Sequence, residues 1–415
     1  MLATKCVVQS YTGGLDGLLA ECLTNTYNAI NYAKEHGIDN RKGMKGYYRT
    51  LKGDDLPSCY KVASITRACA IVKSRNKSGK RGINAVHLKP LRPMICVISG
   101  FFVTMNGRLF VPLRRDKYFY VQLNQYTLEK FAGKKVRSLT ITPDALSFCY
   151  SEDVEPAPVE KVYGVDRNEK NLTFGDRKMV MLVDMTKLVK IRQTTREIVG
   201  SFKRNDVRIR RKLSRKYWRR ANHRSDQILH AATNFIVDSA AKDRAALALE
   251  DLTNIRKMYR RGNGQGADRR FRLNSWPHWK ARQIVGYKAA WNGVSVIQLT
   301  KSETYGSSSM CSACGEKLRS PARDDVAHAR MLWCQKCKGW TDRDVNATLN
   351  LSIRGRSRLD RSLPSRSGGE RATAFSSIEK EKGLAGEAVT GKGTTKTLVL
   401  RVDASKLIRR CEPKS

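Results

Sequence analysis

The stretch from Cys311 to Asn350 contains, in order, Cys311-Ser-Ala-Cys314, Cys334-Gln-Lys-Cys337 and Thr341-Asp-Arg-Asp-Val-Asn-Ala-Thr-Leu-Asn350. The separation of the two Cys-x-x-Cys pairs is typical of tetrahedral zinc sites, so the four thiolates predict one structural Zn²⁺. The acidic string after them opens a helix, and its carboxylates predict a catalytic metal. A zinc ribbon that leads directly into a carboxylate motif indicates a metal-dependent nuclease.

The alternative for the cysteine pairs is a redox site, which would need a thioredoxin-like βαβ context that this sequence lacks. His328 lies between the pairs and is expected at the surface, because four cysteines already complete the metal shell. Whether the ribbon contacts nucleic acid or only braces the following helix stays open. The other seven cysteines are scattered singly and are expected to be small hydrophobic residues or surface thiols.

The charge of the chain points to a polyanionic partner. Its 415 residues include 79 Lys and Arg against 38 Asp and Glu, a formal net charge of +41. This exceeds what solubility requires, and nucleic acid is the polyanion expected for such a protein. A ribosomal or chromatin-like packing protein is the alternative on charge alone.

The chain is expected in the reducing cytoplasm of a prokaryotic cell, acting at the nucleoid. Met1-Leu-Ala-Thr-Lys5 leads into a polar segment rather than a secretory signal, and the longest apolar stretch, 94–103, is about half a membrane span. We therefore expect no membrane partner and no small-molecule substrate.

The hydrophobic pattern predicts two different halves. Segment 4–11 is typical of a strand, and segments 15–35 and 60–73 have helical spacing. Alternating or apolar runs between 91 and 151, separated by turn signals, then predict a small β-barrel with the helices inserted after its first strand.

The second half has an α/β pattern. Strands are expected at 161–166, 171–174, 179–183, 245–250 and 294–299, with helices at 228–241, 279–291 and 344–353. The loop 254–271, rich in glycine and arginine, is expected to be mobile, and 356–396 is expected to be disordered. The apolar patch 397–402 has no assignment.

A strongly basic stretch, 187–224, is a candidate nucleic-acid contact, and a solvated basic helix is its alternative. The candidate residues are Lys203, Arg204, Arg208, Arg211, Arg215, Lys216, Arg219 and Arg220.

Three carboxylates from distant segments are the candidate catalytic site. Asp166 ends one strand, Glu250 ends another and Asp344 begins the final helix, the layout of an RNase H-like nuclease. Such a site binds two Mg²⁺ ions about 3.5–4 Å apart. Each residue alone also fits a structural role. Asp166 could face solvent at a strand end, Glu250 could cap the loop after its strand, and Asp342 or Asp344 could be a charge stabilised at the helix N-terminus. Residues two apart do not share a helix face, so one of that pair is expected to be a ligand, and Asp342 is the better cap.

These residues resemble those of a known family. The segments Val162-Tyr-Gly-Val-Asp-Arg-Asn168, Leu249-Glu-Asp-Leu-Thr-Asn-Ile-Arg256, Asn274-Ser-Trp-Pro277, Tyr287-Lys-Ala289, Cys311-Ser-Ala-Cys-Gly315 and Asp342-Arg-Asp-Val-Asn-Ala347 are similar to the TnpB proteins of insertion sequences, particularly archaeal members. The match is specific from about 162 to 353, and earlier residues resemble the family in architecture alone. One departure is Lys338, which replaces the usual glycine after the last cysteine.

The resemblance implies an RNA-guided DNA endonuclease, related to type V CRISPR effectors, with guide RNA and double-stranded target DNA as partners. It places the catalytic, magnesium-binding triad on Asp166, Glu250 and Asp344, and zinc on the four paired cysteines. The family is often labelled a transposase, but the resemblance does not imply strand transfer.

The implied organisation is a multidomain α/β plus β-barrel protein. A wedge barrel comprises 1–11 and 89–160, with a helical recognition insertion at 12–88. A RuvC-like nuclease domain comprises 161–302 and a final helix at 341–355, with a zinc ribbon at 303–340 between them. The loop 254–266 corresponds to the family's lid, and 356–415 is a basic tail expected to be disordered.

Two other functions remain open from the sequence. One is a guide-directed repressor that binds DNA without cutting it, although this chain keeps all three carboxylates. The other is an unguided zinc-ribbon protein that binds nucleic acid, which leaves Asp166 and Glu250 without a role.

Overall fold

The structure is a computed structural model that describes residues 1–51, 53, 55–79, 92–104, 106–114, 116–202, 207–252, 255, 264, 266–322, 325, 330–362 and 397–408, with backbone alone at 208–210. The chain divides into two compact units. One is Leu2–Asp153, and the other is Met1 together with Val154–Ser415.

The smaller unit contains two antiparallel sheets and a helical cluster. The four-stranded sheet has the order β1-β7-β6-β2, and the three-stranded sheet has the order β3-β4-β5. In the described residues, the strands of the expected barrel therefore form two hydrogen-bonded sheets. The strands are β1 (Leu2–Ser10), β2 (Ile95–Val97), β3 (Phe102–Val103), β4 (Arg108–Arg114), β5 (Lys117–Gln122), β6 (Lys135–Ile141) and β7 (Ala145–Asp153).

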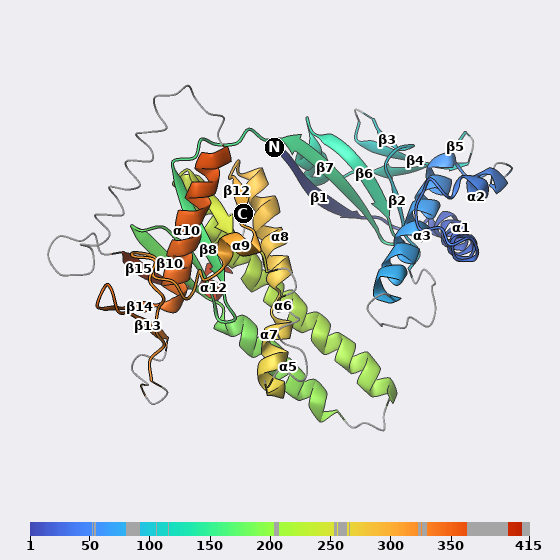
Figure 1. Ribbon diagram of the computed structural model, residues 1–415. Helices are drawn as coiled ribbons and strands as arrows, with labels where there is room; N and C mark the ends of the chain where they lie inside the picture. The colour runs from blue at the N-terminus through green and yellow to red at the C-terminus, as the bar shows by residue number, and fades with distance from the viewer. Residues whose placement is uncertain are drawn as a thin grey trace. The chain divides into compact units, whose positions relative to one another are not determined.

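The helices of this unit come between β1 and β2 in the chain, where the sequence predicts them (Figure 1). Residues of α1, α2 and α3, among them Ile30, Tyr47 and Ile65, share one buried cluster. The helices are α1 (Asp16–Glu35), α2 (Lys45–Thr50), α3 (Ser58–Gly79) and, after β5, α4 (Gln125–Phe131).

The larger unit is built on a six-stranded mixed sheet with the order β12-β11-β8-β9-β10-β15. Strands β8, β9 and β10 are antiparallel neighbours, whereas β11 runs parallel to β8 and β12 parallel to β11. The strands are β8 (Lys161–Arg167), β9 (Asn171–Gly175), β10 (Met179–Asp184), β11 (Ala245–Leu249), β12 (Val296–Gln298) and β15 (Leu398–Asp403).

Helices cover both faces of this sheet (Figure 1). Tyr163 and Val165 of β8 pack in the main core with apolar residues of α6 and α8. Val162, on the opposite face, clusters with Leu351 of α10. The helices are α5 (Thr186–Ser201), α6 (Val207–Lys242), α7 (Ala267–Ser275), α8 (His278–Trp291), α9 (Lys301–Thr304) and α10 (Arg343–Ser362).

Two glycines allow α10 to lie directly on the sheet. A Cβ at Gly164 would stand 2.0 Å from the carbonyl oxygen of Thr348, and one at Gly355 would stand 2.4 Å from the Cβ of Ala248. The Ser352 hydroxyl donates a 2.6 Å hydrogen bond to the carbonyl of Val162 across the same contact. The position of α10 on β8 is therefore fixed by backbone contact.

The expectation of a disordered tail from 356 onward is wrong in two stretches. Helix α10 continues to Ser362, and 398–403 form β15, which pairs in parallel with β10. The short helix α12 (Ala404–Leu407) follows, and its Ala404 and Leu407 are buried in the main core. The unassigned apolar patch is thus a sixth strand, formed because an edge of the sheet was available. Residues 363–396 lie outside the described residues.

Two further boundaries differ from expectation. The sequence predicts that 154–160 belongs to the barrel, but the segment packs with the larger unit, where the Ala157 N–H donates a hydrogen bond to the Gly293 carbonyl. The expected loop 254–271 contains the start of α7, and most of 254–265 lies outside the described residues.

No helix in the described part of the chain is both long and apolar enough to cross a membrane.

Gly164→Ala should destabilise the larger unit strongly, because the new methyl group meets backbone atoms of α10 that cannot move aside individually. We expect a loss of about 3 kcal/mol or more in the free energy of unfolding. The matched control is Gly286→Ala in α8, where a Cβ meets nothing within 4 Å. The control should stabilise the helix by about 0.5–1 kcal/mol. Urea denaturation of both variants measures the difference, and equal midpoints would refute the close-contact argument.

Candidate active site and metal centre

Two neighbouring parallel strands bring Asp166 and Glu250 to the same edge of the sheet. Val165 of β8 is in register with Leu249 of β11, so the next residue of each strand is one of these carboxylates. The alternation of side chains sets both on the face that α10 covers, because Val162 and Ala248 already face that helix. The two acids therefore lie side by side under the start of α10.

Asp344 in the first turn of α10 is the third carboxylate and is 2 % exposed. One of its oxygens accepts a 2.9 Å hydrogen bond from the Asn171 side chain and an ion pair from Arg330. Asp342 has a different position: its Oδ1 accepts the backbone N–H groups of Asp344 and Val345, at 2.8 and 3.1 Å. Asp342 is therefore the helix cap, and Asp344 is the buried acid.

The electrostatics of Asp166 reflect this crowding. Burial, followed by the nearby charges of Glu250 and Asp344, raises the pKa of Asp166 to about 8. Burial also raises the pKa of Glu250, opposed by the Arg167 guanidinium. Like charges held together out of water favour protonation, or a bound cation that replaces the proton. The carboxylate oxygens are ligands that suit a hard cation such as Mg²⁺.

Four neighbouring polar side chains hold these acids, and none of them is a candidate site residue by sequence, although Arg167 and Asn168 stand in the quoted motif. The Asn168 amide donates a 2.6 Å hydrogen bond to Asp166, and the buried Arg167 donates to the carbonyls of Glu250 and His278. Asn171 and Arg330 hold Asp344 as described above. Asn168 and Asn171 flank a turn just after the strand that carries Asp166, and this proximity was the available signal.

The four paired cysteines form a compact metal-ligand group. The sulfur atoms of Cys311, Cys314, Cys334 and Cys337 all lie within 4.8 Å of one another. In the described part of the chain no other group of three or more His, Cys, Asp or Glu ligands is as close, so the three carboxylates are more widely spaced. Four thiolates at this distance fit one tetrahedral Zn²⁺.

The backbone supports both cysteine turns. Gly315 has φ of 74°, and Lys338 has φ of 54°, a left-handed conformation that favours glycine. The lysine that departs from the resemblance therefore adopts a backbone conformation in which glycine is favoured. The strands β13 (Met331–Cys334) and β14 (Gly339–Asp342) pair on either side of the second turn.

Helix α10 binds the first cysteine turn directly. The Asn346 and Asn350 side chains each donate a 2.8 Å hydrogen bond to the Met310 carbonyl, and Asn346 accepts the Ser312 N–H at 2.9 Å. The cysteine segment thus braces the helix that carries Asp344, which answers part of the question that the sequence left open. His328 lies outside the described residues.

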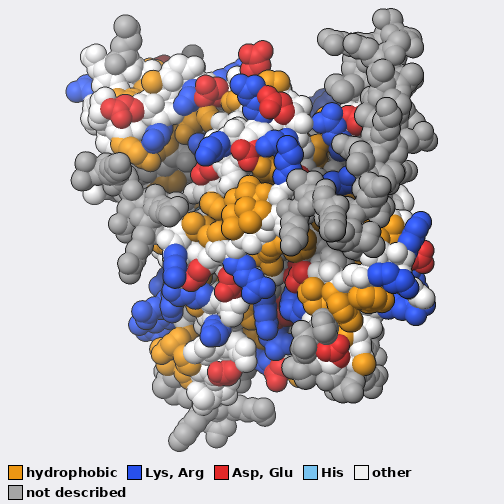
Figure 2. Space-filling view, turned by 90° about the vertical axis from the view of Figure 1, so that its left-hand side faces the viewer, with side chains coloured by type: hydrophobic (Ala, Val, Ile, Leu, Met, Phe, Trp, Pro, Cys, Tyr) orange, Lys and Arg blue, Asp and Glu red, His pale blue; other side chains and the backbone are white. Residues whose placement is uncertain are grey.

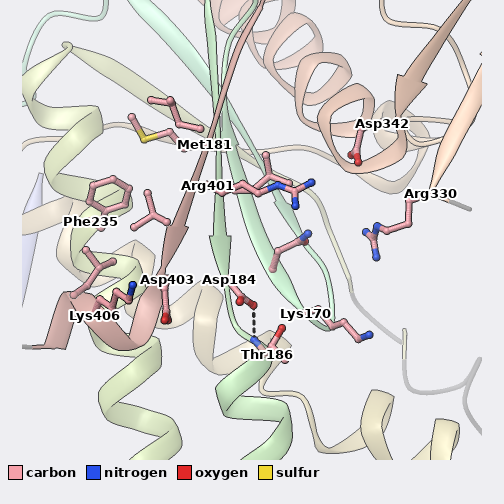
Figure 3. A pocket seen from close by; sticks show the side chains of 15 residues that line it. Lys170, Met181, Asp184, Thr186, Phe235, Arg330, Asp342, Arg401, Asp403 and Lys406 are labelled. Carbon is pink, nitrogen blue, oxygen red and sulfur yellow. Dashed lines mark hydrogen bonds between the residues drawn. The ribbon is translucent and has the colours of Figure 1, made fainter. Parts of the chain in front are cut away.

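A groove of about 860 Å³ lies beside the carboxylates and is shown in Figure 3. Asn171 and Arg330, which hold Asp344, also line this groove. Arg401 projects from β15 toward the side where Arg330 and Asp342 lie (Figure 3). Lys170 and Lys406 add further positive charge to the lining. Asp184, Asp342 and Asp403 also line it, so the groove carries both basic and acidic side chains, and the tail strand builds one of its walls.

Six of the eight predicted basic contact residues, from Arg208 to Arg220, fall in the N-terminal half of α6. Those with described side chains, Arg211, Arg215, Lys216, Arg219 and Arg220, are all exposed. Lys203 and Arg204 lie outside the described residues, as does the side chain of Arg208. Lys and Arg side chains are also scattered over the face shown in Figure 2, among hydrophobic and acidic ones.

A model of the Cas12f1-like TNB domain family matches residues 278–351. The TnpB-like protein MJ0751 of Methanocaldococcus jannaschii is 30% identical over 233 residues, which cover 52% of this chain and 77% of that protein. The CRISPR-associated endodeoxyribonuclease Cas12f1 of Sulfoacidibacillus thermotolerans is 33% identical over 134 residues, 32% of this chain and 28% of that protein. A solved Cas12f1–sgRNA–target DNA complex aligns with a TM-score of 0.49 at 14% identity, over 81% of each chain.

Asp166→Asn should stabilise the metal-free protein at neutral and alkaline pH. The raised pKa means that ionised Asp166 destabilises the fold increasingly as pH rises from about 4 to about 8. The amide cannot ionise, so it removes this penalty. At pH 8.5 the melting temperature of the variant should be higher by about 2–4 °C for each kcal/mol gained in the free energy of unfolding. At pH 5 the difference should be clearly smaller than at pH 8.5, because only the first part of this range has been crossed.

Thermal melts without added divalent cations measure this effect, and Mg²⁺ should then stabilise wild type more than Asp166→Asn. A variant that is less stable than wild type at both pH values would contradict the electrostatic argument.

Lys338→Gly should strengthen the metal-binding turn, because glycine adopts φ of 54° without the clash of a Cβ. The expected gain is about 1 kcal/mol, or about fivefold slower metal loss to a chromophoric chelator. Lys336→Gly is the matched control, since Lys336 is exposed in the same turn without a positive φ. Faster metal loss from Lys338→Gly than from wild type would show that the lysine side chain stabilises the turn.

Proposed function

The chain belongs to the TnpB family, and from this premise we propose that it is an RNA-guided DNA endonuclease using Asp166, Glu250 and Asp344. The observation that carries the proposal is the meeting of three acids from β8, β11 and α10 at one edge of the sheet. A relative whose name describes an endodeoxyribonuclease supports the same chemistry.

The fold assignment is part of the proposal. The strand order β12-β11-β8-β9-β10, with three antiparallel strands followed by two parallel ones, is the order we assign to an RNase H-like, RuvC-type domain. The cysteine segment is then a zinc ribbon inserted between β12 and α10, and the smaller unit is the wedge barrel with its helical recognition insertion. In this assignment β15 is an addition to the edge of the nuclease sheet.

Asp166, Glu250 and Asp344 would hold two Mg²⁺ ions, which when bound activate the attacking water and stabilise the leaving oxygen. The chain's own side chains prepare the acids for this task. Asn168 orients Asp166, Arg167 fixes the backbone at Glu250, and Asn171 orients Asp344. Arg330 contacts Asp344 and faces the groove, so its guanidinium is placed to contact a phosphate of the strand as well.

The proposed partners are a guide RNA and double-stranded target DNA. A net charge of +41 fits a protein that holds nucleic acid by its phosphates, while base pairing supplies the sequence specificity. The exposed basic residues of α6 are the proposed contact with the backbone of the guide–target duplex. The groove that Arg330 and Arg401 line is the proposed path of the strand that is cut.

Asp166→Ala and Asp344→Ala should each abolish cleavage while leaving guided binding intact. Loss of residues that merely orient metal ligands costs about 10- to 100-fold, so removing a ligand should reduce the cutting rate by at least about 100-fold. The assay sequences the co-purified RNA and incubates the protein and Mg²⁺ with plasmids that carry the matching target beside a randomised flank. Glu197→Ala, an exposed acid on α5, is the matched control and should cut like wild type.

The outcomes separate the alternatives. Cutting by wild type and Glu197→Ala alone supports the proposal. Guide-dependent binding without cutting by any protein would favour a repressor, and purification without a discrete RNA would favour an unguided zinc-ribbon protein. Full cleavage by Asp166→Ala would refute the assignment of the site.

A further inference from the structure

The three-stranded sheet of the smaller unit has one buried face and one aromatic face. Leu109, Val111 and Val121 of β4 and β5 point to the buried face. The register pairs Phe110 with both Phe102 and Tyr120, and pairs Pro112 with Tyr118, so these side chains occupy the opposite face. Each of the three strands contributes at least one ring.

The four rings form a continuous layer in which Phe110 is central. The Phe110 ring centroid lies 4.4 Å from that of Phe102, nearly parallel, and 4.6 Å from that of Tyr120, edge to face. Tyr118 lies 6.0 and 6.2 Å from Phe102 and Phe110. The outer rings are open to solvent: Phe102 is 48% exposed, Tyr118 39% and Tyr120 56%.

Sheet stability alone does not explain this layer. Cross-strand aromatic pairs do stabilise sheets, but the opposite face of the same strands already supplies a buried aliphatic core. Three large rings left in water on one small face are the composition expected of a surface that contacts a ligand. Adjacent aromatic rings on an exposed sheet face are a means by which proteins stack unpaired nucleobases.

The surrounding charge identifies the class of ligand. Arg108 is exposed on the same face, paired across the strands with Gln122, and Lys117 is exposed at the hairpin end of β5, one residue before Tyr118. In residues 2–153, Lys and Arg outnumber Asp and Glu by about two to one. A second copy of a chain with net charge +41 would be repelled from such a surface, whereas a nucleic acid would be attracted to it.

We propose that the face formed by Phe102, Phe110, Tyr118 and Tyr120 binds unpaired bases of single-stranded RNA by stacking. The RNA is favoured over DNA because the tyrosine hydroxyls of Tyr118 and Tyr120 can hydrogen-bond a ribose 2′-OH. The inference rests on the proposed function in one respect, that the bound RNA is the guide RNA. It assigns the smaller unit a base-contacting surface in addition to phosphate contacts.

The test measures binding of the full chain, freed of nucleic acid and without divalent cations, to a single-stranded 12-nucleotide oligouridine. Phe102→Leu and Tyr120→Leu should each weaken binding about 5- to 100-fold, the effect of losing one stacked base. The dependence of affinity on salt should keep its slope, because no phosphate contact is lost. Tyr126→Leu, an exposed tyrosine on α4, is the matched control and should bind like wild type.

A second measurement keeps the inference testable if a variant fails to fold. Wild type is irradiated with the same oligonucleotide carrying 5-iodouridine, and the cross-linked peptides are identified by mass spectrometry. Cross-links at the four rings support the proposal, and cross-links confined to other segments overturn it.

Four other results would overturn the proposal. The first is an unchanged affinity of the leucine variants for the oligouridine. The second and third are an equal loss of affinity for double-stranded RNA of the same length or for deoxy-oligouridine. The fourth is a concentration-dependent dimer of the wild type that the variants abolish. Because no cleavage is measured, a chain that stacks RNA but cuts no DNA would refute the proposed function alone. A chain that cuts DNA while the variants bind normally would refute this inference alone.

Discussion

The candidate site depends on one steric constraint, the contact between the backbones of α10 and β8. Gly164 leaves room for the backbone of Thr348 and Ser352, which a Cβ at this position would meet. Gly355 in the same helix likewise leaves room for the side chain of Ala248. This contact sets Asp344 over the edge of the sheet that carries Asp166 and Glu250. It also fixes Asn346 and Asn350 against the first cysteine turn. The acids and the cysteine group are therefore positioned by a single helix.

The contact between α10 and the sheet also places three carboxylates near one another in a buried site, which is electrostatically unfavourable. Acids held together out of water resist ionisation, as the raised pKa of Asp166 indicates. The surrounding side chains relieve this only partly. Asn168 and Asn171 donate neutral hydrogen bonds, and the charge of Arg330 falls on Asp344. Arg167 lowers the pKa of Glu250 by its charge, but its hydrogen bonds go to backbone carbonyls. The negative charge that remains is what suits the site to hard cations.

The sequence predicted the elements that have a strong local signal. The cysteine spacing anticipated the four-sulfur group, and the expected strands at 161–166 and 245–250 correspond to β8 and β11. It also predicted helices between β1 and β2. It missed β15, because a short apolar patch after a long polar tail becomes a strand only when the edge of β10 is available. Arg330 and Asn171 were missed for a related reason: their role depends on contacts with Asp344, which is distant in sequence.

The distribution of charge and aromatic residues suggests how such a protein would divide its contacts. Basic side chains on α6 and in the groove attract any phosphate backbone, so they supply affinity without discrimination between RNA and DNA. Discrimination needs groups that contact bases or the ribose hydroxyl, and positive charge cannot provide it. In the described residues of the smaller unit, the exposed aromatic face of β3, β4 and β5 meets that requirement, while the acids lie in the larger unit. In the proposed function, recognition of an RNA and hydrolysis of a DNA strand would thus be assigned to two compact units, each with its own cluster of buried residues.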